Sequence, residues 1–130
     1  MSNSVYIKET TVRPDQLACS MKSGTLEVFA TPALIALMEE TAMESVAATL
    51  EEGITTVGTH IEADHLAASP VGAIIRCECT LVEQDGRRYV FELAAYEGEE
   101  LIGKGRHERF AVKIDRFMAK VEAKKEKYSL

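Results

Sequence analysis

The sequence predicts an α+β domain in which one long helix is wrapped by a curved antiparallel sheet. A helical segment runs from Thr31 to about Glu51, four segments with strand patterns follow it, and short turns connect those strands. Consecutive strands joined by short turns pair antiparallel, and one helix beside such a sheet gives an α+β architecture. Because a single sheet covers only one side of a helix, we expect a second copy to complete the enclosure as a homodimer.

Length and composition fit one domain over residues 1–130. Of the 130 residues, 46% are hydrophobic and 28% are charged, which is typical of a globular protein with a core. No apolar run approaches the roughly 20 residues of a membrane span, and the N-terminus lacks a secretory signal pattern. A net charge of −6 disfavours nucleic acid and anionic membranes as partners. We therefore expect a cytoplasmic location with reduced cysteines.

The segments before and at the start of the helix carry clear local signals. A first strand is expected at residues 5–12, and residues 15–27 are expected to be irregular because they contain several helix and strand breakers. Thr31 is a good N-cap residue, and Pro32 fits the first helical position because its missing N–H would be unpaired there. Gly53 is expected to end the helical region.

Turn signals divide the rest of the chain into strands and a tail. The expected strands are residues 54–66, 73–82, 87–96 and 101–114. In the last of them the apolar alternation changes phase between Leu101 and Phe110, which predicts a β-bulge. Residues 115–130 are strongly charged and compatible with a helix, and we expect them to be exposed.

Two cysteines share one face of a predicted strand. Cys77 and Cys79 are separated by one residue, and such a pair is able to ligate a metal, but no further ligands occur at a recognisable spacing. We therefore interpret both cysteines as core residues and expect no metal site.

Glu39 lies on an otherwise apolar face of the predicted helix. At about 100° per residue, its neighbours on that face are aliphatic. They are Ile35, Ala42, Met43, Val46 and Leu50. An ionised carboxylate there costs several kcal/mol unless another group pairs with it or a reaction uses it. Glu39 is therefore expected to be either a buried structural acid or a functional one.

The strand at 54–66 directs a histidine toward the same interior. Strict alternation places His65 with Val57 and Ile61 on the face toward the helix, and Gly58 on the opposite face. His65 and the helix carboxylate are then expected to meet in one largely dry cavity, which suits acid–base catalysis. A buried Glu–His pair that fixes the helix against the sheet explains the same pattern, and periodicity leaves both interpretations open.

Thr31 also has two interpretations. As an N-cap it needs no catalytic role. The helix N-terminus nevertheless presents free N–H groups and positive potential, which are suited to polarising a carbonyl or stabilising an oxyanion.

Three runs of the sequence resemble one known family. They are VFATPALIALMEETA at 28–42, GTHIEADHLAASPVG at 58–72 and GKGRHERF at 103–110. Their order and spacing are similar to the fluoroacetyl-CoA thioesterase-like branch of the hot-dog-fold acyl-CoA thioesterases. The resemblance implies a hot-dog fold, a homodimer and hydrolysis of an acyl-CoA thioester, with coenzyme A present as part of the substrate and no other cofactor.

The same resemblance implies roles for individual residues. It makes Thr31, Glu39 and His65 catalytic, and it places Gly58 and Arg109 in the substrate-binding site. The segment before the V-F-A-T motif is aromatic-rich in the fluoroacetyl-specific enzyme, whereas here residues immediately before that motif lack aromatic side chains. We therefore expect an acyl group other than fluoroacetyl. The alternative function is a non-catalytic module of the same fold that binds acyl-CoA or a small hydrophobic ligand.

Overall fold

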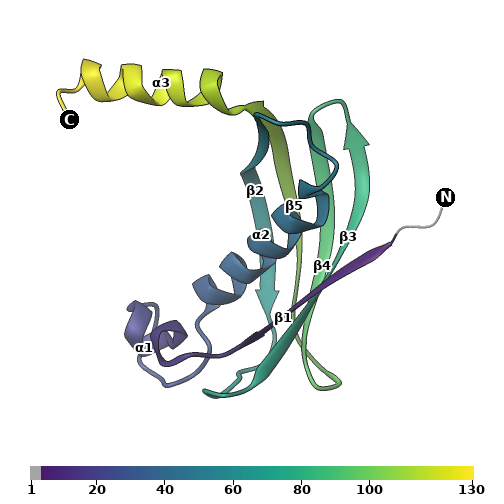
Figure 1. Cartoon of the computed structure of the whole chain (residues 1–130). Helices are drawn as coiled ribbons and strands as arrows, with labels where there is room; N and C mark the ends of the chain where they lie inside the picture. The colour runs from purple at the N-terminus through teal and green to yellow at the C-terminus, as the bar shows by residue number, and fades with distance from the viewer. Residues whose placement is uncertain (1–3) are drawn as a thin grey trace.

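The computed structural model describes residues 4–130 and shows one antiparallel sheet curved around a central helix (Figure 1). The sheet contains five strands in the order β1-β3-β4-β5-β2, so β1 and β2 form its edges. The strands are β1 Val5–Thr11, β2 Ile54–His65, β3 Ile74–Asp85, β4 Arg88–Glu97 and β5 Glu100–Lys113, and the helices are η1 Pro14–Gln16, α1 Ala18–Met21, α2 Thr31–Ala47 and α3 Ile114–Lys127. The predicted α+β architecture is confirmed.

Two helical predictions differ from the structure. Helix α2 ends at Ala47 rather than near Glu51, and Gly53, with φ +84°, lies in the turn just before β2. Near the helix end, the Thr49 hydroxyl donates to the Val46 carbonyl, a local bond that competes with continuation of the helix. The segment 15–27, which was expected to be irregular, contains α1 and part of η1.

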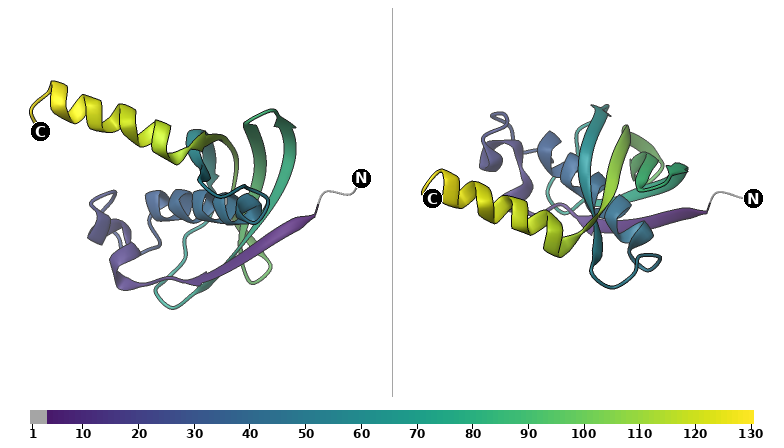
Figure 2. Two further views of the ribbon diagram at one scale, coloured as in Figure 1. Left: turned by 45° about the horizontal axis from the view of Figure 1, so that its top comes forward. Right: turned by 90° about the horizontal axis from the view of Figure 1, so that it is seen from above.

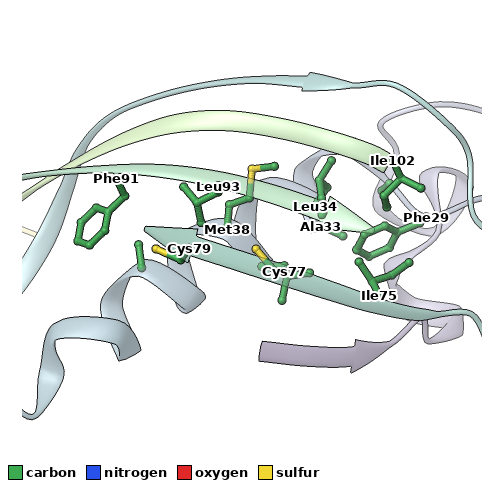
Figure 3. Close-up of a cluster of buried hydrophobic side chains, with 14 of the residues drawn as sticks. Phe29, Ala33, Leu34, Met38, Ile75, Cys77, Cys79, Phe91, Leu93 and Ile102 are labelled. Atoms are coloured by element: carbon green, nitrogen blue, oxygen red, sulfur yellow. The ribbon is translucent and has the colours of Figure 1, made fainter. Parts of the chain in front are cut away.

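The core lies between α2 and the concave face of the sheet. In Figure 3, Leu34 and Met38 of α2 point toward Cys77, Leu93 and other side chains of the sheet, all of them buried. Burial raises the pKa of both sheet thiols, that of Cys79 to about 12, so both stay protonated at neutral pH. The interpretation of these cysteines as core residues is confirmed.

Three bulges interrupt the sheet; one lies in β3 at Val82, and the other two, in β5 and β2, concern the sequence predictions. In β5 the pairing with β4 shifts between Ala95 and Tyr96, which leaves Ile102 as the extra residue and confirms the predicted bulge. A second bulge, which strict alternation did not predict, lies in β2, where Thr59 is the extra residue opposite β5. It reverses the facing of the first half of β2. The prediction that Gly58 faces away from the helix is therefore wrong.

Helix α3 stands apart from the rest of the fold. It follows directly from β5, its residues are all exposed, and it extends away from the sheet and α2 (Figure 2). Within residues 4–130, no helix is both long enough and apolar enough to cross a bilayer.

Candidate active site

The first candidate pair joins the start of α2 to the end of β2. The hydroxyl Oγ1 of Thr31 lies 2.8 Å from Nδ1 of His65. The N-cap of α2 is Ala30, and no side chain caps the helix. The prediction that Thr31 is the N-cap is therefore wrong. Thr31 is the first helical residue, and its hydroxyl points toward His65 of the sheet. It therefore does not accept a hydrogen bond from the backbone N–H groups at the helix start.

The environment of His65 keeps its imidazole neutral and leaves one ring nitrogen free. The ring packs edge-on against Phe29, with centroids 6.5 Å apart. Burial lowers the pKa of His65, and this outweighs the opposite effect of the Ala67 backbone. Its Nε2 is buried and makes no hydrogen bond to any of residues 4–130. The pair lines a cavity of about 320 Å³, and the buried Nε2 becomes available to a ligand only if the side chains around it move.

Glu39 lines a different cavity. It is half-buried on α2 and borders a hollow of about 740 Å³ together with Ala36, Met43 and Arg109. Its carboxylate forms no hydrogen bond or ion pair with the part of the chain that the structure describes. The apolar face that carries Glu39 is only partly covered, since Met43 is 38% exposed. Ala42 and Val46 on the same face are buried, so within one chain Glu39 is a partly exposed acid on a partly buried face.

Gly58 allows this carboxylate to lie against β2. A Cβ on Gly58 would lie 3.0 Å from Oε2 of Glu39, which is closer than carbon and oxygen comfortably approach. The missing side chain therefore creates the space in which Glu39 packs. Because of the Thr59 bulge, Gly58 belongs to the inner face, and the substrate-site role that the family resemblance implied stays a prediction.

Arg109 is held rigidly beside that space. It is only 6% exposed, and its guanidinium donates to the Thr56 hydroxyl at 2.8 Å, to the Thr56 carbonyl at 2.9 Å and to Nε2 of His107 at 3.1 Å. Burial lowers the pKa of Arg109, and the nearby Glu39 carboxylate acts in the opposite direction. A positive group is thus fixed close to Glu39.

Sequence reasoning missed Thr56 and His107. Spacing offered one usable signal, because His107 and Arg109 are two residues apart in a strand and so share a face. Thr56 was hidden by the bulge in β2, which reverses its facing relative to strict alternation.

The structure separates two groups that were expected to meet. Thr31 and His65 line one cavity and Glu39 lines another, with no lining residue in common. Along α2, Glu39 is eight residues beyond Thr31, about 12 Å at the usual helical rise. The prediction that Glu39 and His65 share a cavity is therefore wrong for the single chain.

Comparison with known proteins identifies the family of this chain. Residues 12–115 match the family model described as "FlK: Fluoroacetyl-CoA-specific thioesterase". The fluoroacetyl-CoA thioesterase of Streptantibioticus cattleyicolor is 38% identical over 98 residues, which cover 75% of this chain and 70% of the relative. These similarities confirm the resemblance seen in the three sequence runs.

Solved structures show the same architecture. A structure of the fluoroacetyl-CoA thioesterase FlK has a TM-score of 0.90 and 30% identity, covering 95% of this chain and 96% of that one. A hypothetical protein of Thermus thermophilus, described as a thioesterase superfamily member, has a TM-score of 0.91 at 27% identity and covers 99% and 96%. A hot-dog-like protein of Thermanaerovibrio acidaminovorans, at 22% identity, 94% and 90% coverage and a TM-score of 0.85, shares the fold. The predicted hot-dog fold is confirmed.

Proposed function

Because this chain belongs to the fluoroacetyl-CoA-specific thioesterase family of hot-dog proteins, we propose that it hydrolyses an acyl-CoA thioester to a free acid and coenzyme A. The observation that supports this most directly is the pair of Thr31 and His65: both residues line one cavity, and the neutral imidazole has a buried Nε2 with no hydrogen-bond partner among residues 4–130. Glu39, a carboxylate without an ion pair among residues 4–130, supplies the second reactive group.

The roles follow from charge development during the reaction. The thioester carbonyl lies at the start of α2, where free backbone N–H groups and the Thr31 hydroxyl stabilise the oxyanion. Glu39 attacks the carbonyl carbon or deprotonates the attacking water, and the C–S bond breaks as the tetrahedral intermediate collapses. When Glu39 attacks, the thiolate leaves as the anion and is protonated by solvent. When water attacks directly, the neutral His65 imidazole relays the proton that water gives up to the departing thiolate, accepting one proton as it donates another. In the first route, water then hydrolyses the anhydride formed on Glu39, and both routes give the acid and free CoA.

We propose that a homodimer brings these groups together. Strand β2 is an edge strand of 12 residues, and an uncovered edge is a template for pairing with another chain. Antiparallel pairing about a two-fold axis near Ile61, midway between Gly58 and His65, sets the His65 of one protomer beside the Gly58 of the other. The Glu39 of the second protomer lies against that glycine, so each site combines groups from both chains.

The acyl group is proposed to differ from fluoroacetyl. Residues 22–26 are exposed and contain no aromatic side chain that closes over a small acyl group. No cofactor other than the CoA of the substrate takes part in this mechanism. The three free cysteines fit the reducing cytoplasm as its location.

A thiol-release assay over a panel of acyl-CoAs tests the function. We expect release of CoA from at least one short or medium acyl-CoA, with the protein unchanged in mass after turnover. Fluoroacetyl-CoA in the same panel tests the specificity. Tight binding of acyl-CoA without release across the panel would contradict hydrolysis and support the binding module.

A further inference from the structure

A second histidine, which the proposed reaction does not use, lies behind Arg109. His107 of β5 is 1% exposed and packs against Phe91 of β4, with ring centroids 6.3 Å apart. Its Nδ1 lies 2.7 Å from the carbonyl oxygen of His60 on β2, and its Nε2 lies 3.1 Å from Nη1 of Arg109. Contacts from three strands therefore fix the ring.

The two hydrogen-bond partners determine the tautomer of His107. A carbonyl oxygen only accepts, so Nδ1 carries the proton, and a guanidinium only donates, so Nε2 offers its lone pair to Arg109. The imidazole is therefore neutral. A proton on Nε2 would remove the hydrogen bond to Arg109 and place two cations in direct contact.

The charged and titratable groups around His107 act in opposite directions. Burial has the largest effect and lowers the pKa of His107, and the positive charge of Arg109 and the side chain of His60 lower it further. The bond to the His60 carbonyl and the charge of Glu39 on α2 raise this pKa, and Phe91 on β4 carries no charge. The net direction is downward, in agreement with the neutral tautomer.

His107 and Thr56 together determine the plane of the Arg109 guanidinium. Thr56 accepts from Nε and Nη2, and His107 accepts from Nη1. Of the five N–H groups of Arg109, the remaining two have no partner within residues 4–130. Both Nη1 of Arg109 and Oε2 of Glu39 lie within 3.4 Å of the point where a Gly58 Cβ would be.

We propose that His107 is a positioning residue for the thioesterase reaction: as a neutral acceptor, it orients the Arg109 guanidinium toward Glu39 and the acyl group. This inference rests on the proposed function. One consequence concerns acid pH. Protonation of His107 at Nε2 breaks its hydrogen bond to Arg109, so the guanidinium loses its orientation and turnover falls. Protonation of His65 lowers turnover in the same pH range.

Two variants separate the contact to Arg109 from the contact to His60. In His107→Gln the side-chain carbonyl reaches the Nε2 position and accepts from Arg109, whereas in His107→Asn the amide donates to the His60 carbonyl and no acceptor remains for Arg109. We expect H107N to lose about 10-fold or more in kcat, with a smaller change in KM, because a misplaced group near the reacting atoms is costly. H107Q should retain several times the turnover of H107N and lose part of the acid limb of the pH profile.

A stability control and a double variant complete the kinetic test. Val46→Ala removes buried side-chain volume at the far end of α2 and should lower stability without this kinetic pattern. The loss in the double variant H107N/R109K should be no greater than in R109K alone, because His107 acts through Arg109. The proposal would be overturned if H107N and H107Q lost equal amounts of kcat and these losses were proportional to their decreases in melting temperature.

A spectroscopic readout is independent of turnover. In ¹⁵N-histidine-labelled protein, NMR should show His107 protonated at Nδ1 and unprotonated at Nε2 through neutral pH, and a proton on Nε2 would overturn the proposal. Absence of hydrolysis by the unmodified protein would overturn the proposed function and this role with it. Normal hydrolysis combined with full activity of H107N would overturn this role alone.

Discussion

At the scale of single residues, the hydrogen-bond partner of the Thr31 hydroxyl shows whether this residue caps α2 or is available for the reaction. A Thr-Pro pair at a helix start fits either the N-cap or the first helical position, and these differ by one residue. In the structure the hydroxyl bonds His65, and Ala30 occupies the N-cap. The hydroxyl is therefore available for chemistry without loss of a helix cap.

Replacement of Thr31 by valine tests this assignment. Valine keeps the shape but removes the hydroxyl, so we expect turnover to fall about 10-fold or more while the free energy of unfolding changes by less than about 1 kcal/mol. Thiol release and urea denaturation measure the two quantities. Unchanged turnover with a stability loss of about 1 kcal/mol would instead indicate a capping role.

Glu39 and His65 should each prove essential to turnover. We expect Glu39→Gln and His65→Ala each to lower kcat by about 10²-fold or more, the scale of general acid–base catalysis. Glu52→Gln, at an exposed glutamate in the turn after α2, is the matched control for charge removal. Full activity in the first two variants, together with lower melting temperatures, would show that the two residues stabilise the fold and do not take part in the reaction.

Stability should rise with pH as the two inward histidines lose protons in the unfolded chain. The pKa values of His65 and His107 are lowered in the folded protein, so the unfolded state binds more protons between those values and about 6.5. The free energy of unfolding therefore increases with pH through that window and levels off above it. Urea denaturation from about pH 5 to pH 8 measures the slope, and H107Q should reduce it. A slope of opposite sign would contradict the burial of neutral histidines.

At the scale of elements, β2 shows what a sequence pattern is able to predict. Composition and turn residues located every strand to within a few residues, because those signals are local. The bulge at Thr59 was missed because it depends on pairing with β5, where the Thr59 hydroxyl donates to the Glu108 carbonyl. One extra residue reverses the alternation, so strict periodicity placed Gly58 on the wrong face.

The candidate site was predictable to a similar degree. Family resemblance pointed to Thr31, Glu39 and His65 by position, and their catalytic roles stay predictions. The contact between Thr31 and His65 was not predicted and is a finding of the structure. The network of Thr56 and His107 around Arg109 was not predictable, because it joins β2 and β5 across more than 40 residues.

Substitution of Gly58 by alanine tests how tightly β2 packs on the helix. The added Cβ would lie 3.0 Å from Oε2 of Glu39, so the carboxylate must move. We expect kcat to fall about 10-fold, since small displacements of a reacting group are costly, with little change in fold. Circular dichroism and thiol-release kinetics measure both effects. Unaltered kcat would show that the position of Glu39 against β2 is not the reactive one.

At the scale of the whole molecule, the separate cavities predict complementation between inactive variants. If each site takes His65 from one protomer and Glu39 from the other, co-refolded E39Q and H65A chains form heterodimers with one intact site. An equal mixture should then recover about a quarter of the unmodified activity, because half the dimers are mixed and one of their two sites is intact. Activity no higher than that of the separate variants would place both residues in a site within one chain.

The unpaired edge of β2 also makes the specific activity depend on the concentration of the protein. Since the proposed site exists only where two such edges meet, dilution below the dissociation constant should lower the specific activity even though every chain stays folded. The initial rate would then grow faster than linearly with enzyme concentration. Lower expression would therefore reduce the activity more than in proportion, because a larger fraction of the chains would be inactive monomers.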